Sequence, residues 1–281
     1  MAPEWTWPAS HLVISSISTV LMLQTWIPLN SMAWHMPTWS LSNEAFFYFL
    51  FPFVLPLFGR LSRKWLVAVI AFGVLFGLST TALYNAIQPD GPNALAPRHP
   101  ATWSYFMAFN PLSRCPEFLM GMATGFLFLR SKRDRRFAWP LLLIGLGALM
   151  AIIFAVPHDP AKIGHAAVMS PIFALMVYGI ALQPQGLGIL KNRFGVLLGD
   201  ASYSVYLLHT LVIAAFIKFF HDSAGNLRHQ TWPALLLVVV IICVAAILTY
   251  KYIEEPLRRK LRPKRKHELA ATASTTCVAV A

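Results

Sequence analysis

Four short segments place ionisable or hydroxyl side chains inside or beside long apolar runs, where such groups are costly and therefore functional candidates. The first segment, residues 37–52, reads PTWSLSNEAFFYFLFP and brings Trp39, Ser42 and Glu44 to the start of an apolar run. Ser42 could cap the following helix, and the helix dipole would stabilise Glu44 in its first turn. Those roles do not explain Trp39 and Ser40 beside the acid, so a structural and a functional interpretation both stay open.

The second segment, residues 114–125, reads RCPEFLMGMATG. Arg114 and Glu117 are three residues apart, so they can share one helix face and form an ion pair. Gly121 and Gly125 are four residues apart and would let a second helix approach closely. The segment is therefore either a structural ion pair beside a packing groove, or a buried arginine that binds a carboxylate or phosphate.

The third segment, residues 199–209, reads GDASYSVYLLH. With Asp200 as a helix start, the helical period puts Ser202, Tyr206 and His209 on one face, with Tyr203 adjacent. A hydroxyl, phenols and an imidazole along one face favour a substrate-lining role over a single structural histidine.

The fourth segment, residues 250–259, reads YKYIEEPLRR and closes the last apolar run. Interfacial tyrosines and a snorkelling lysine account for it, so the structural interpretation is favoured. No glycine-rich phosphate loop, nucleophile elbow or metal-ligand spacing occurs in the chain, and no metal site is expected.

The composition defines the elements that must position these residues. Of 281 residues, 57% are hydrophobic and only 12% are charged, which excludes a disordered chain and argues against a soluble enzyme. Apolar runs of near-spanning length predict an all-α, polytopic bundle of eight transmembrane helices. They lie at about 11–28, 44–58, 65–87, 105–129, 137–157, 165–182, 196–220 and 232–253.

Clusters of lysine and arginine predict the orientation. They fall at residues 59–64, 131–136, 191–193 and 258–266, all on one side of an eight-span bundle. The positive-inside rule then places both termini in the cytoplasm. The net charge of +12 thus suits the anionic leaflet, and no nucleic-acid partner is expected. We expect a membrane domain over residues 1–257 and a basic, then low-complexity, tail over 258–281.

The same four segments, in this order, resemble the motifs of the acyltransferase family 3 membrane proteins. WSLSNEAFFYFLFP is similar to that family's WSLSxE-x-x-FY-x-x-x-P motif, and RCPEFLMG is similar to its R-x-x-E-F-x-x-G segment. LGDASYSVYLLH resembles its LG-x-x-SY-x-x-Y-x-x-H segment, and YIEEPLRR resembles its closing E-x-P motif, with Glu254 and Pro256. The resemblance runs from about residue 11 to about residue 260.

The resemblance implies an integral membrane O-acyltransferase of the inner (plasma) membrane. Such an enzyme moves an acyl group, commonly acetyl, from an acyl-CoA co-substrate to a sugar hydroxyl of a cell-surface or secreted glycan. It needs no bound cofactor. Under this interpretation Glu44 and His209 are catalytic, and the other polar residues of the motifs bind substrate: Trp39, Ser42, Arg114, Glu117, Ser202, Tyr203 and Tyr206.

The sequence departs from the family pattern at one point. The family's first span carries an R-x10-H motif whose histidine is regarded as the base, and no arginine here has a histidine eleven residues later. We therefore expect the chain to lack the two or three N-terminal spans of the family, which leaves its own turnover open. Two alternatives remain: a membrane carrier or flippase for an anionic or lipid-linked solute, and a non-catalytic remnant.

Overall fold

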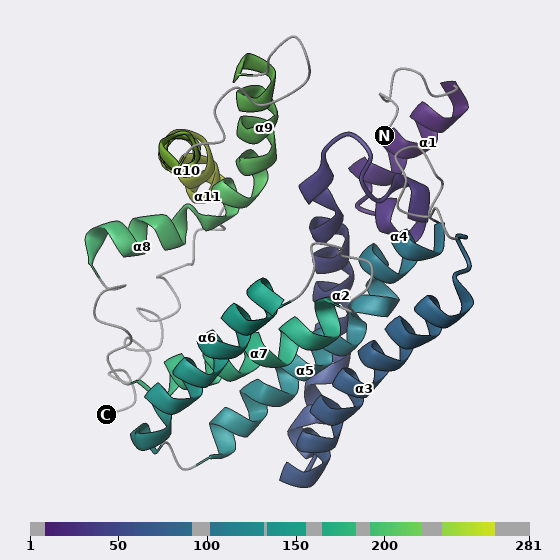
Figure 1. Ribbon diagram of the computed structural model, residues 1–281, viewed down its shortest axis with the longest axis vertical. Coiled ribbons are helices and arrows are strands. Elements are labelled where there is room, and N and C mark those ends of the chain that lie inside the picture. Colours follow the sequence, from purple (N-terminus) through teal and green to yellow (C-terminus); the bar gives the residue numbers. More distant parts are fainter. Residues whose placement is uncertain are drawn as a thin grey trace, which may run out of the picture. The chain divides into compact units, whose positions relative to one another are not determined.

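The computed structural model describes residues 9–91, 102–131, 134–155, 165–183, 192–220 and 232–261. All regular structure in these ranges is helical (Figure 1). The chain forms two compact units, Met1–Asn192 and Arg193–Ala281.

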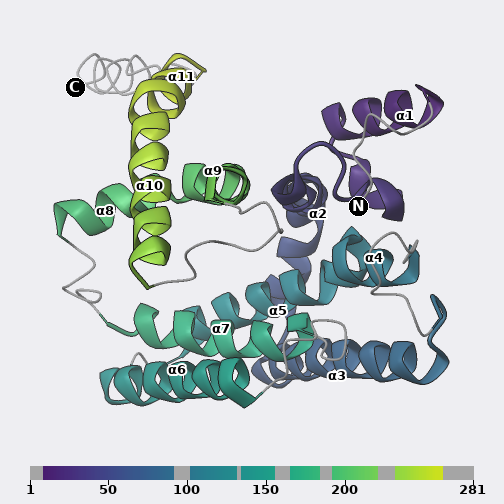
Figure 2. The same cartoon turned by 45° about the horizontal axis from the view of Figure 1, so that its top comes forward.

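The first unit is a bundle in which one helix, α5, contacts α2, α3 and α7, while α6 packs on α7 (Figure 2). Its N-terminal part is a helix followed by three short 3-10 turns: α1 (Ala9–Val20), η2 (Gln24–Trp26), η3 (Pro28–Asn30) and η4 (Met36–Thr38). The remaining elements are α2 (Trp39–Arg60), α3 (Arg63–Ile87), α4 (Thr102–Phe109), α5 (Pro111–Arg130), η5 (Arg135–Phe137), α6 (Ala138–Ala155) and α7 (His165–Ala181).

The predicted fourth span is two helices, α4 and α5, which meet at Asn110. The Asn110 side chain accepts a hydrogen bond from the Leu112 amide at 2.9 Å and so caps α5. Pro111 follows at the first helical position, where its missing N–H costs nothing. The predicted irregularity in this span is confirmed at Asn110, whereas Pro116 stays inside α5.

The second unit packs α9 (Ser202–Phe220) against α10 (Trp232–Thr249). It begins with α8 (Arg193–Asp200) and ends with a π-helical turn, η8 (Tyr250–Glu254), followed by α11 (Glu255–Leu261). The single helix predicted at 196–220 is wrong, because the chain breaks at the buried Ala201. Asp200 consequently ends α8 instead of starting α9. Gly195, Gly199 and Asp200 all have low helix propensity and lie just before the break.

Among the residues that the structure describes, five helices are long and apolar enough to cross a membrane. They are Met36–Arg60, Arg63–Ile87, Arg135–Phe154, Ser202–Phe219 and Trp232–Leu261, and two shorter apolar helices cover Ser10–Val20 and Met169–Ala181. Large apolar side chains along them are exposed, as expected for surfaces that lipid covers. The polytopic, all-α architecture is thus confirmed, while the count of eight spans and the cytoplasmic position of both termini stay predictions.

The predicted boundary after residue 257 falls within α11, which continues to Leu261. Residues 262–281 of the predicted tail lie outside the described residues, as do residues 92–101, 158–164 and 221–231 of the predicted outer loops.

Close helix packing occurs at other glycines than those predicted. An added Cβ at Gly121 or Gly125 would meet nothing within 4 Å, so their predicted role in close helix approach is wrong. At Gly179 of α7 an added Cβ would lie 3.0 Å from the Ala138 carbonyl oxygen of α6. At Gly73 of α3 it would lie 2.6 Å from the side chain of Met120 in α5.

Candidate functional site

Ser42 fastens the N-terminal turns onto α2. Because α2 begins at Trp39, the predicted helix-capping role of Ser42 is wrong. Its buried hydroxyl donates to the Met22 carbonyl oxygen at 2.6 Å and accepts from the Thr25 hydroxyl at 2.6 Å. Ser42 therefore positions the loop that precedes Trp39, and its contact with substrate stays a prediction.

A layer of buried amides surrounds this contact, and the sequence analysis missed it. The Gln24 Nε2 atom donates to the Thr38 carbonyl at 2.9 Å, and the Asn110 Nδ2 atom donates to the Thr25 carbonyl at 3.2 Å. The Gln24 Oε1 and Asn43 Oδ1 atoms are buried with no hydrogen-bond partner among the described residues. The sequence could have indicated this layer, because asparagine and glutamine are costly to bury unpaired and their presence in such an apolar sequence suggests buried hydrogen bonds.

Arg114 and Glu117 form the predicted ion pair, and Trp39 joins them. The Arg114 Nη1 atom lies 2.7 Å from Glu117 Oε1, and its Nε atom donates to the Ala108 carbonyl at 2.7 Å. The guanidinium carbon lies 5.5 Å from the centre of the Trp39 ring, within cation–π range. We call these three residues the Arg114 cluster.

Two aromatic contacts hold the cluster in place. The Trp39 ring packs 5.2 Å from the Phe109 ring at the end of α4. The Phe47 ring of α2 stacks on the Phe118 ring of α5, with centres 4.8 Å apart and planes 1° apart. The WSLSNE and RCPEF segments therefore meet because their aromatic residues pack together.

The Arg114 cluster can bind an oxygen-bearing group. The guanidinium is a planar fork of N–H donors, and Nη2 has no hydrogen bond among the described residues. The side chain is 20% exposed and that of Glu117 is 29% exposed, so both remain accessible. Such a fork suits a carbonyl oxygen, a carboxylate or a phosphate.

Glu44 does not join this cluster. It is exposed on α2, and its position five residues after Trp39 turns it about 140° around the helix axis. The predicted place in the first turn of the helix is wrong, since α2 starts earlier. The catalytic role of Glu44 stays a prediction.

In the second unit the predicted polar face of α9 is partly formed. The Tyr206 and His209 rings lie 5.8 Å apart, and His209 Nδ1 is 2.6 Å from the Tyr206 carbonyl oxygen. Both side chains are half-buried, whereas Ser202 is exposed and Tyr203 is 43% exposed. The structure thus brings Tyr206 and His209 together and leaves Ser202 and Tyr203 toward the outside.

Ser204 is a residue that the sequence analysis missed. Its buried hydroxyl donates to Glu254 Oε2 at 2.9 Å, which ties α9 to the π-helical turn η8. Tyr250 begins that turn, is buried, and accepts a hydrogen bond from Arg258 at 3.2 Å. π-Helical turns are rare in proteins, and those that occur are often found at functional sites. The sequence does show Ser204, as the second serine of the SYS triplet. The analysis passed over it because it does not lie on the same helix face as Ser202, Tyr206 and His209.

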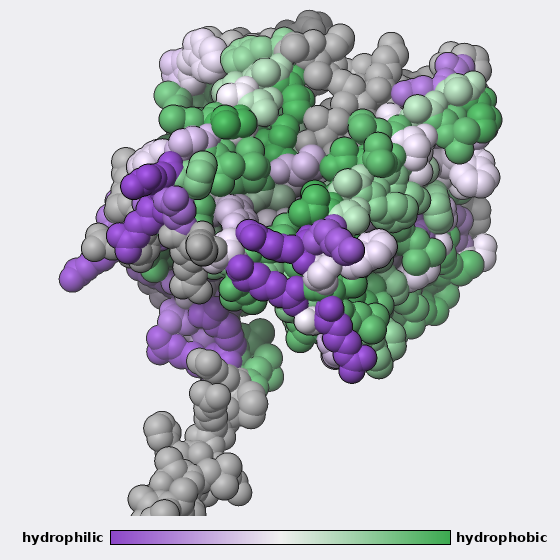
Figure 3. Space-filling model, turned by 90° about the horizontal axis from the view of Figure 1, so that it is seen from below, coloured by the Kyte–Doolittle hydropathy of each residue, from purple (hydrophilic) through white to green (hydrophobic). Residues whose placement is uncertain are grey.

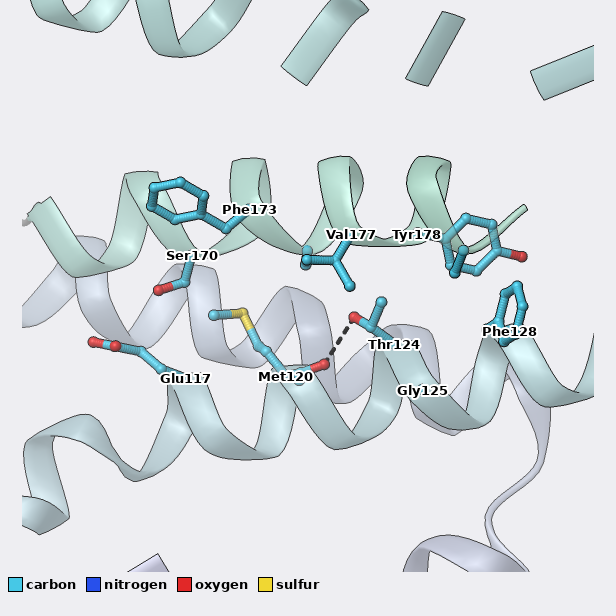
Figure 4. Close-up of a pocket in the computed structure, with 12 residues that line it drawn as sticks. Glu117, Met120, Thr124, Gly125, Phe128, Ser170, Phe173, Val177 and Tyr178 are labelled. Carbon is cyan, nitrogen blue, oxygen red and sulfur yellow. Dashed lines mark hydrogen bonds between the residues drawn. The ribbon is translucent and has the colours of Figure 1, made fainter. Parts of the chain in front are cut away.

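A cavity of about 370 Å³ lies in the first unit between α5 and α7. Figure 4 shows Glu117 and Ser170 at one end, and Phe128 and Tyr178 at the other. Its walls are almost entirely apolar side chains: Met120, Phe173, Ala174, Val177 and Ala181. Glu117 both lines this cavity and belongs to the Arg114 cluster.

Within the described ranges, no three histidine, cysteine, aspartate or glutamate side chains gather as metal ligands. Cys115 and Cys243 are both free thiols.

Comparison with known proteins identifies the family. A family model described as an acyltransferase domain matches residues 2–251. Acyltransferase MdmB of Streptomyces mycarofaciens is 27% identical, over 97% of this chain and 71% of its own length. O-acetyltransferase OatA of Staphylococcus aureus is 25% identical, over 83% of this chain and 39% of its own length.

Exopolysaccharide production protein ExoZ of Rhizobium meliloti is 31% identical, over 53% of this chain and 44% of its own length. The chain therefore spans less than half of OatA and ExoZ. No solved structure matches. The family match covers the first three motifs and ends at residue 251, just before the fourth, and several of the helices that carry the motifs are apolar enough for a bilayer. The chain belongs to acyltransferase family 3 and is a multi-pass membrane enzyme that transfers acyl groups.

Proposed function

We propose that the protein is an O-acyltransferase of the inner membrane that moves an acyl group, acetyl in the simplest case, from acyl-CoA to a sugar hydroxyl of a cell-surface or secreted glycan. The observation that carries this proposal is the Arg114 cluster, an accessible guanidinium with a donor to spare. The names of OatA, an O-acetyltransferase, and ExoZ, an exopolysaccharide production protein, support the acetyl group and the glycan acceptor.

The reaction is a transesterification from sulfur to oxygen. The acceptor hydroxyl oxygen attacks the thioester carbonyl carbon, and a base removes the hydroxyl proton. The tetrahedral intermediate then collapses, the carbon–sulfur bond breaks, and CoA leaves as a thiol after it takes up a proton. The products are an O-acyl ester and free CoA.

Arg114 donates to the carbonyl oxygen as negative charge develops on it. Removal of one such donor typically costs about 10²–10³-fold in turnover. Glu117 and the Trp39 ring fix the guanidinium, so that its position does not depend on substrate.

Glu44 and His209 are the proposed acid–base residues, and a base of this kind contributes about 10²–10⁴-fold. Ser42 holds the loop ahead of Trp39. Ser202, Tyr203 and Tyr206 are the proposed acceptor-binding residues.

The test is acyl transfer by the protein as its gene encodes it, purified into nanodiscs with radiolabelled acetyl-CoA and glycans of the parent cells. Arg114→Ala is expected to lower label transfer about 10²-fold or more, because the oxyanion loses its donor. The control is Arg193→Ala, an exposed arginine at the start of α8 and outside the Arg114 cluster, which should transfer at the wild-type rate.

Wild-type transfer by Arg114→Ala at normal expression would remove Arg114 from the site. Proton-dependent solute movement without CoA consumption would instead favour a carrier. An absence of both activities would favour a non-catalytic remnant.

A further inference from the structure

The cavity between α5 and α7 is a long groove with chemically different ends. Along α5 it runs from Glu117 to Phe128, which is about 16 Å at 1.5 Å per residue. One end is the Arg114–Glu117 ion pair. At the other end, Tyr178 donates to the Ser131 hydroxyl at 2.8 Å, which fixes α7 beside the end of α5.

Basic side chains gather at that second end. Arg130 donates to the carbonyl oxygens of Phe58, Gly59 and Leu61, so the end of α5 lies against the turn between α2 and α3. Hydrophilic residues form clusters on the face shown in Figure 3. We define the basic edge as the exposed lysine and arginine residues at the adjoining ends of these helices: Arg60, Arg63, Lys64, Arg130, Arg135 and Arg136.

The floor of the groove is open down to the backbone. An added Cβ at Gly121 or Gly125 would meet nothing within 4 Å, and both glycines line the cavity. Hydroxyls lie among the apolar walls: Thr124 donates to the Met120 carbonyl at 2.8 Å and can still accept, and Ser170 has no hydrogen bond among the described residues. A narrow chain with occasional amide groups fits such a groove.

We propose that this groove binds the pantetheine arm of the acyl-CoA donor, an inference that rests on the proposed function. The arm lies along Gly121 and Gly125, the phosphates of the nucleotide head contact the basic edge, and the thioester carbonyl reaches Arg114. The ligand has an anionic head, a thin arm and a reactive carbonyl, in the order in which the basic edge, groove and Arg114 cluster follow one another. A phospholipid could also place its phosphate at the basic edge and its acyl chain along the apolar walls, but it would leave the Arg114 end without a hydrogen-bonding partner.

The test measures equilibrium binding of radiolabelled CoA to the whole protein in nanodiscs. Gly125→Leu fills the groove and is expected to weaken the Kd about tenfold or more, which corresponds to about 1.4 kcal/mol. Gly147→Leu is the matched control, because its added side chain also meets open space but lies on α6 away from the cavity. It should bind CoA as the wild type does, and both variants should elute and melt as folded protein.

A second measurement separates the head from the reactive end. The double variant Arg63→Gln, Lys64→Gln is expected to raise the KM for acetyl-CoA about tenfold (about 1.4 kcal/mol). The KM for S-acetyl-N-acetylcysteamine, a truncated thioester without phosphates, should stay unchanged.

The outcomes that overturn the groove and the function differ. If Gly125→Leu still transfers acyl groups and binds CoA with wild-type affinity, the proposal that the groove binds CoA is wrong, while the proposed function stands. Loss of co-purified lipid from Gly125→Leu with unchanged CoA affinity would assign the groove to lipid. A wild-type protein that neither binds CoA nor transfers acyl groups would remove the proposed function together with the groove.

Discussion

At the residue scale, the geometry of Arg114 matters as much as its charge. Its guanidinium donates to the Ala108 carbonyl and to Glu117, and the guanidinium carbon lies over the Trp39 ring, 5.5 Å from its centre. A lysine would keep the charge but would lose the fork of N–H donors. The charge and the direction of the donors can therefore be separated by experiment.

Arg114→Lys is expected to lower kcat/KM for acetyl-CoA by about 10-fold to 100-fold, because one well-placed charged hydrogen bond is worth about 1.5–3 kcal/mol. Thermal unfolding should shift little, since the pair is partly exposed. Initial rates of CoA release check this. Rates equal to those of the wild type would show that charge alone suffices and would contradict a directed donor.

A pair of serines on α9 separates structure from substrate binding. Ser204→Ala removes the donor to Glu254 and leaves a partly buried carboxylate with one contact fewer, so unfolding free energy should fall by about 1–2 kcal/mol. Ser202→Ala changes an exposed residue on the same helix and should leave stability within about 0.5 kcal/mol. Thermal unfolding in one detergent compares the two, and equal shifts would contradict the assigned role of Ser204.

At the element scale, the pair α6 and α7 is held by backbone proximity. Gly179 lets α7 approach the α6 backbone, where an added Cβ would lie 3.0 Å from the Ala138 carbonyl oxygen and 3.2 Å from the Leu142 amide nitrogen. Backbone atoms cannot rotate away as a flexible side chain can. The helices must therefore separate to admit even a methyl group.

Gly179→Ala is expected to lower the melting temperature, because displacement of two packed helices outweighs the gain in helix propensity of about 1 kcal/mol. Gly147→Ala has open space around its Cβ and should keep or raise the melting temperature. Differential scanning calorimetry of both variants under the same conditions tests the contact between α6 and α7. A stabilised Gly179→Ala protein would show that α6 and α7 do not pack this closely.

Elements defined by long apolar runs could be predicted from the sequence, whereas their breaks could not. The bodies of α2, α3 and α10 follow from hydropathy alone. The break at Asn110 depends on a side-chain cap, and the break at Ala201 depends on burial of that residue, neither of which periodicity reports.

The Arg114–Glu117 pair was predictable because it is local in sequence. The approach of Trp39 to Arg114 was not, since it depends on packing between α2 and α5.

At the scale of the whole molecule, the orientation in the membrane decides which substrate meets which end of the site. Arg60, Arg63, Lys64, Arg135 and Arg136 are exposed at helix ends of the first unit. The positive-inside rule assigns such ends to the cytoplasm, where CoA is available. Under the proposed function, the glycan acceptor would then approach from the opposite side.

This orientation predicts which single cysteines, placed at the ends of helices in a protein without its native cysteines, can be labelled from each side of the membrane. Ser62→Cys, between α2 and α3, should react with a membrane-impermeant maleimide only in inside-out vesicles. Pro89→Cys, an exposed position just after α3, should react only in right-side-out vesicles, because α3 is long enough to cross the bilayer. Labelling of both from one side would contradict the span assigned to α3.

The most direct test of the central claim is the balance of acyl groups in one reaction vessel. The protein as its gene encodes it is incubated with acetyl-CoA and parent-cell glycan, and free CoA thiol and ester-linked acetyl on the glycan are measured together. We predict equal amounts of both in the wild type and a loss of both in Arg114→Ala. Thiol release without ester on the glycan, or ester formation that persists in Arg114→Ala, would contradict O-acyl transfer at the Arg114 cluster.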